Sequence, residues 1–178
     1  MSLVLDGTNG VTYPTGNTGN GIVSGTAQAS TSGTRIDFTG IPSWAKRVTV
    51  MFNGVSTNGT SPNLSIQVGS GSIAVSGYVA GQTYVLVSGA ASGGASSIYL
   101  FPIQYGVSSY ALSGALVFNL LGSNIWCAEG VFYNSVTAPY ICQVAGTVAL
   151  SGALDRVSIC TSTGTDTFDA GSINILYE

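Results

Sequence analysis

The sequence contains no histidine and very little charge. Four of its 178 residues are Lys or Arg and seven are Asp or Glu, so 6% are charged and the formal net charge is −3. Histidine is the most common general base and a common metal ligand, so its absence removes both from the available chemistry. A Ser-His-Asp triad is excluded. So few basic residues also argue against a nucleic-acid-binding surface.

The few ionisable side chains form no evident catalytic or metal-binding pattern. Lys46 is the single lysine and lies beside Arg47 at the entrance to an apolar run. Asp166 and Asp169 lie in a Gly- and Thr-rich turn, where Asp usually accepts nearby backbone N–H groups; a hard-cation site is the alternative there. Glu129 lies among apolar neighbours, facing either solvent or an interface. We therefore predict no catalytic, metal-binding or cofactor-binding residues and no enzymatic activity.

Cysteine is scarce and its spacing is unspecific. Cys127, Cys142 and Cys160 form no CxxC pair, and an odd number of thiols cannot all pair within one chain. We predict three free thiols, which fits assembly in a reducing cytoplasm. Residues 1–10 lack the basic and apolar regions of a secretory signal. The longest apolar stretch, 111–132, is interrupted by Asn, Ser, Glu and Gly, so we expect no membrane insertion.

The sequence is rich in short apolar segments separated by Gly, Ser and Asn. Residues 47–52 alternate between apolar and polar and end at Asn53-Gly54, a strong turn signal. Residues 84–87 and 115–121 are continuous apolar runs, which predict strands covered on both faces. No 11-residue window offers an amphipathic helical stripe. The pattern predicts an all-β fold, an antiparallel, jelly-roll-like β-sandwich of about nine to eleven strands.

The first part of the chain differs in composition from the rest. Residues 1–21 are rich in Gly, Asn and Thr and contain few apolar side chains, so they cannot build a core of their own. We predict a short extended N-terminal attachment arm over residues 1–21 and a β-sandwich head over residues 22–178.

A single sandwich has only one interior, so strands that are apolar on both faces need a second cover. Packing between subunits would supply it. The run 115–121 therefore makes Leu116, Phe118 and Leu120 candidate subunit-interface residues.

Tyrosines make a second candidate surface. Tyr99, Tyr105 and Tyr110 occur close together in a region rich in hydroxyl side chains. Such residues suit sugar recognition by ring stacking and hydrogen bonding, which makes them candidate glycan contacts. Tyrosines of a core or an interface explain the same residues equally well.

Three parts of the sequence resemble sequences of known proteins. They are LVLDGTNGVTYPTG at residues 3–16, FTGIPSWAKRVTVMFNGVSTNG at residues 38–59, and LDRVSI with DTFDAGSINI at residues 154–159 and 166–175. The first resembles the connector of tailed-phage tail fibre proteins, and the others resemble a domain common in tail fibres and other virion proteins. Residues 70–150 carry no such likeness. In tail fibres a long shaft usually precedes this domain, whereas here Met1 stands just before the connector.

The resemblance implies a non-enzymatic bacteriophage virion protein, assembled in the host cytoplasm. It would be a short tail fibre or adhesin-like component that mediates attachment; the alternative is a capsid decoration, cement or head-fibre protein. Since fibres are typically trimeric, it implies a homotrimer. Expected partners are other virion proteins, contacted through the arm, and a host cell-surface glycan. The family offers no catalytic residues to place on this chain, and no cofactor is expected.

Overall fold

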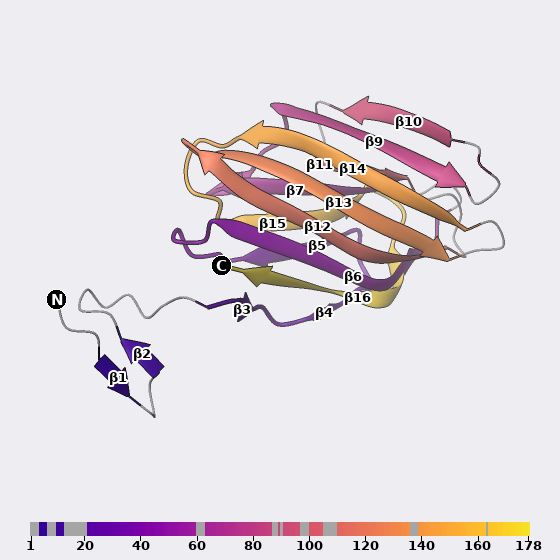
Figure 1. Cartoon of the computed structure of the whole chain (residues 1–178). Coiled ribbons are helices and arrows are strands. Elements are labelled where there is room, and N and C mark those ends of the chain that lie inside the picture. The colour runs from indigo at the N-terminus through magenta and orange to yellow at the C-terminus, as the bar shows by residue number, and fades with distance from the viewer. Residues whose placement is uncertain are drawn as a thin grey trace.

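The chain folds into two antiparallel β-sheets that pack face to face, as the computed structural model shows (Figure 1). The structure describes residues 4–6, 10–12, 21–59, 63–86, 89, 91–96, 100–104, 110–135, 139–162 and 164–178. Within these residues it contains sixteen strands and no helix, so the predicted all-β sandwich is confirmed. Several strands have only two or three residues, which is why their number exceeds the nine to eleven expected.

The large sheet has nine strands in the spatial order β10-β9-β14-β13-β12-β6-β16-β3, and β4 also pairs with β16. These strands are β3 (Val23–Ser24), β4 (Gln28–Ala29), β6 (Arg47–Thr57), β9 (Tyr78–Leu86), β10 (Ala91–Ser96), β12 (Ala111–Gly122), β13 (Ile125–Ser135), β14 (Tyr140–Ala149) and β16 (Phe168–Tyr177).

The small sheet lies behind the large one in the view of Figure 1 and has the spatial order β11-β7-β15-β5, with β8 pairing with β7. Its strands are β5 (Arg35–Thr39), β7 (Asn63–Ser70), β8 (Ser72–Ile73), β11 (Leu100–Gln104) and β15 (Arg156–Thr161). The two remaining strands, β1 (Val4–Asp6) and β2 (Gly10–Thr12), pair with each other. They fall in the predicted arm, most of which lies outside the described residues, so the division at residue 21 stays a prediction.

A tight hairpin sets which residues of the central strands face inward. Ser123 and Asn124 connect β12 to β13 with positive φ angles of 49° and 60°, as a type I′ hairpin turn requires at both central residues. The pairing then runs from Leu120 opposite Trp126 to Ala111 opposite Ser135. Because side chains alternate along a strand, this register sends one set of residues into the sandwich and the other set outward.

Asn53-Gly54 is not a turn, and the prediction that the strand ends there is wrong. β6 continues to Thr57. Its register shifts at this point against both neighbours, β12 and β16. Gly54 has a φ of 62°, and its N–H donates to the hydroxyl of Ser113 at 3.0 Å. A β-bulge uses the same positive φ as a turn, so the dipeptide alone does not distinguish the two.

The core lies between the sheets and draws on both of them. Phe52 of β6 and Phe132 of β13 meet edge to face with ring centroids 5.3 Å apart. The largest fully buried side chains are those of Tyr78, Phe118, Phe132, Phe168, Leu64, Ile66, Leu112 and Leu116. Together with the other buried apolar residues of both sheets they form one cluster. The sandwich therefore has a single interior, as its two-layer design demands.

Tyr78 ties the large sheet to the small one. It begins β9, and its hydroxyl donates to the carbonyl oxygen of Ala74 at 2.7 Å and accepts the N–H of Val68 in β7 at 3.2 Å. Burial raises the pKa of Tyr78 from its ordinary 10.0 to about 12, because the phenolate would lose its hydration. The hydroxyl therefore stays protonated in the folded chain where the unfolded chain would ionise.

We expect the protein to lose stability in alkaline solution. A tyrosine whose pKa is about 12 when folded and 10.0 when unfolded contributes stability that is complete below pH 10 and is lost as the pH rises through 12. Urea unfolding at about pH 8 and about pH 11 measures this loss. Tyr78→Phe should cost about 1–2 kcal/mol at the lower pH by removing two hydrogen bonds. It should also reduce the alkaline loss; an undiminished loss in this variant would contradict the assignment.

Candidate functional site

The charged side chains of the described residues are dispersed. Arg47 pairs with Glu178 at 2.9 Å, and Arg156 pairs with its neighbour Asp155 at 2.7 Å. The hydrogen bond from Arg156 lowers the pKa of Asp155 below its ordinary value. In the part of the chain that the structure describes, no group of three or more Cys, Asp or Glu could hold a metal ion. The same residues include no helix long and apolar enough to cross a membrane.

The segment that holds Asp166 and Asp169 is tied to the end of β6. The hydroxyl of Ser56 donates to the carboxylate of Asp169. The backbone N–H of Thr167 donates to Oδ1 of Asn58 at 2.9 Å. These contacts join the start of β16 to its neighbouring strand. They support a structural role for this segment, but only Asp166 lies before the strand, and the prediction that Asp169 also lies in the turn is wrong because Asp169 belongs to β16.

The most unusual surface is the outer face of the large sheet, which we define as the outward residues of β9, β14, β13 and β12. Register aligns them in rows across the strands. One row holds Val85, Ile141 and Tyr133, which are paired in that order. A parallel row holds Gly81, Ala145, Glu129 and Val117. The outer face is thus a regular array of side chains, in rows that cross the four strands.

Large apolar side chains are exposed on this face. Val79 is 73% exposed and Val131 is 52% exposed. The other large apolar side chains exposed on these strands are those of Val85, Tyr133, Ile141 and Leu121. So many exposed large apolar side chains on one sheet face usually mark a site of protein–protein or membrane contact.

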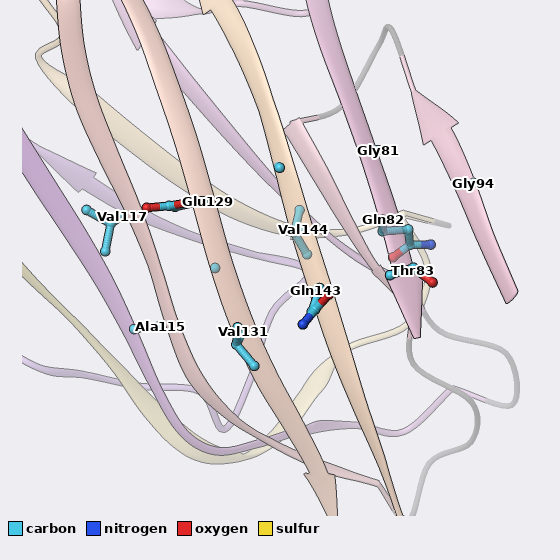
Figure 2. Close-up of a pocket in the computed structure, with 12 residues that line it drawn as sticks. Gly81, Gln82, Thr83, Gly94, Ala115, Val117, Glu129, Val131, Gln143 and Val144 are labelled. Atoms are coloured by element: carbon cyan, nitrogen blue, oxygen red, sulfur yellow. The ribbon is translucent and has the colours of Figure 1, made fainter. Parts of the chain in front are cut away.

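A shallow trough runs across the outer face and encloses about 890 Å³. Figure 2 shows its lining residues spread over β9, β12, β13 and β14, with Gly94 of β10 at one side. Its floor is low because Gly81, Ala115 and Ala145 carry little or no side chain. Glu129 and Gln143 add a carboxylate and an amide. Among the outward positions of the four strands that define the face, Glu129 is the single charged residue.

The exposed edge strand of the small sheet, β5, is polar by contrast. Arg35 and Asp37 are exposed there on β5. The guanidinium Nη1 of Arg35 donates to the hydroxyl of Ser158 on β15 at 2.7 Å. Gln67 is buried on the same side of β7, opposite Ser158 in the register. The edge strand β5 is therefore polar and open to water, whereas the outward side chains of Ser65, Gln67 and Ser158 on β7 and β15 are buried.

The predicted interface residues need correction. Leu116 and Phe118 are fully buried in the core, and Leu120 packs against the core. They face the sandwich interior because they share the parity of Leu112 on β12. Buried side chains cannot contact a second subunit, so the outward residues of the same strand, such as Val117, take their place as interface candidates.

The candidate glycan contacts are only partly placed. Tyr99 and Tyr105 lie outside the described residues. Tyr110 is half-buried, and its ring centroid lies 6.2 Å from that of Tyr140. Burial raises the pKa of Tyr140 to about 12, although Nδ2 of Asn134 donates to its hydroxyl at 2.7 Å. Tyr110 therefore packs beside a buried ring, and a glycan contact through these tyrosines stays a prediction.

The surface that sequence reasoning missed was signalled by strand parity. Val131 and Tyr133 of β13 and Ile141 of β14 are apolar at positions that alternate with buried residues. An apolar residue at every position of a two-layer strand predicts an outer face with its own partner. Glu129, whose direction the sequence left open, is exposed and lies in the trough.

All three cysteines are free thiols, as predicted. Cys142 and Cys160 are buried, whereas Cys127 is partly exposed on the outer face. Burial raises the pKa of the Cys160 thiol above its ordinary value, which slows its reaction further.

Thiol titration should reflect this difference in burial. We expect Cys127 to react first in dilute folded protein and Cys142 and Cys160 to react only after unfolding, because a reagent reaches exposed thiolates. Denatured protein should show three reactive thiols without reductant. One reactive thiol in denatured, unreduced protein would mean that the other two are oxidised and would contradict the assignment.

Comparison with known proteins gives no relative. No protein-family model, no curated protein and no solved structure matches the chain.

Proposed function

We propose that the chain is a non-enzymatic structural protein of a bacteriophage virion, a short tail fibre or adhesin-like component that mediates attachment. The observation that carries the proposal is the apolar outer face of the large sheet, an extended surface suited to assembly with other protein subunits. In such a role the sandwich is a rigid scaffold. Several copies held together would convert weak contacts with a host glycan into avidity.

Two of the three parts of the chain that resemble virion proteins lie side by side in the fold. Residues 38–59 include the end of β5 and all of β6, while residues 154–159 and 166–175 lie in or next to β15 and β16. β6 pairs with β16, and β5 pairs with β15. Segments more than a hundred positions apart thus form neighbouring strands, which supports reading them as parts of one structural unit.

The alternative is a capsid decoration, cement or head-fibre protein. The same outer face favours it, since an apolar sheet face fits the surface of another virion subunit as well as that of a copy of this chain. Both proposals place the protein in the virion, assembled in the host cytoplasm as a homotrimer with residues 1–21 bound to another virion protein. They differ in its position on the particle.

Imaging of particles labelled with an antibody against this chain tests the proposal. Label on the tail is the expected result, and label on the capsid shell would favour the alternative. The particles without antibody and an antibody against an unrelated protein are the controls. Purified particles that carry no label, although the antibody recognises the chain in the lysate, would overturn both proposals.

A further inference from the structure

The outer face has a ridge and a trough that lie next to each other. The ridge is the row of Val85, Ile141 and Tyr133, all exposed and all larger than alanine. The trough is centred on Gly81 and Ala145, which pair with each other four residues along the same strands from Val85 and Ile141. Every copy of the chain therefore presents both a projecting apolar row and a recess of about 890 Å³.

We propose that the ridge of one copy packs into the trough of a second copy of the same chain. The inference rests on the proposed structural role and specifies the surface through which copies assemble. Close packing of complementary surfaces is what gives stable interfaces the density of a protein interior. Because ridge and trough belong to the same face, contact between copies can fill the trough and cover the ridge of each copy as the assembly closes.

The large sheet as a whole, of which these four strands are a part, is wide enough for a stable contact. Strands lie about 4.8 Å apart and rise about 3.3 Å per residue, so seven strands with about nine residues each cover roughly 1,000 Å². A standard interface buries about 800 Å² on each partner. The seven strands from β10 to β16 in the large sheet supply this width.

The charges of the face also suit a copy of the same chain. Glu129 is the single charged residue at the outward positions of the four strands, and Arg47 on the neighbouring β6 already pairs with Glu178. A strongly charged partner would find no complementary charge on this face, whereas a second copy brings an equally uncharged surface. The exposed edge strand β5 of the small sheet, with Arg35 and Asp37, remains in contact with water.

Sedimentation equilibrium of the full chain tests the inference with two matched variants. Val131→Asp places a charge at a trough residue that is 52% exposed in one chain. Thr39→Asp places the same charge at an exposed position on the opposite side of the sandwich. At about 100 μM we expect the unmodified protein and Thr39→Asp to sediment as a dimer or trimer. Val131→Asp should sediment as a folded 18.0 kDa species.

Circular dichroism melts establish whether each variant is folded. Ala145→Asp, at an exposed floor residue of the trough, replaces Val131→Asp if that variant does not fold. A monomeric unmodified protein at this concentration would overturn the inference, and so would folded trough variants that assemble as tightly as Thr39→Asp. Either result would leave the particle-labelling test of the proposed function unaffected. If purified particles carry no label while assembly in solution depends on the trough residues, the proposed function alone is overturned.

Discussion

Phe118→Asp should abolish the folded state, whereas Val117→Asp, one residue earlier, should leave the fold intact. Phe118 is fully buried in the core, and Val117 points outward into the trough. Loss of a buried Phe side chain costs about 3–5 kcal/mol, and an unpaired buried carboxylate costs several more. The sum is comparable with a total stability of about 5–15 kcal/mol.

Circular dichroism and urea unfolding measure both variants. We expect no cooperative transition for Phe118→Asp, and a transition within about 1 kcal/mol of the unmodified protein for Val117→Asp. Val117→Asp should also fail to assemble, since its carboxylate would lie in the contact. Equal destabilisation by the two substitutions would contradict the strand parity on which both the core and the outer face depend.

Gly171→Ala should destabilise the chain far more than Gly40→Ala. Both glycines have positive φ, +93° for Gly171 and +77° for Gly40. A Cβ at residue 171 would lie 2.4 Å from the carbonyl oxygen of Gly54, while a Cβ at residue 40 would meet nothing within 4 Å. The left-handed conformation alone costs alanine about 1–2 kcal/mol. We expect a loss of about 1–2 kcal/mol for Gly40→Ala. For Gly171→Ala we expect a loss of at least about 3 kcal/mol, because the backbone of Gly54 cannot move aside without strain.

Urea unfolding of the two alanine variants measures the difference. The result also reports on the bulge in β6, because Gly54 lies in it and Gly171 lies opposite, between the paired residues Ala170 and Ser172 of β16. Similar destabilisation by both substitutions would mean that the two strands do not approach closely at this bulge.

The fold class could be predicted from the sequence because it depends on local features. Alternation over residues 47–52 and the continuous apolar run 115–121 both became strands of the large sheet. The extent of β6 could not be predicted in the same way. Asn53-Gly54 specifies a positive φ, and whether the chain then reverses or bulges depends on strands that pair with it from far along the sequence.

The candidate site was predicted in kind but assigned to the wrong side of a strand. The apolar run 115–121 indicated a second apolar surface, but it contains large side chains at both parities, so nothing local distinguishes Phe118 from Val117. The distinction comes from the register with β6 and β13, which positions Phe118 opposite Val48 and Ala128. The outward orientation of the Glu129 side chain follows from the same register, which pairs Glu129 with Val117 and Ala145.

The central claim is that a second copy covers the outer face of the large sheet, and thiol protection measures this cover directly. In a Cys127→Ser background, the thiol introduced by Ala145→Cys lies in the trough, and the thiol introduced by Thr39→Cys lies on the polar edge strand β5. We expect the trough thiol to be protected in concentrated protein and to become reactive on dilution, while the control thiol reacts equally throughout. A trough thiol that reacts as fast as the control at every concentration would contradict the account.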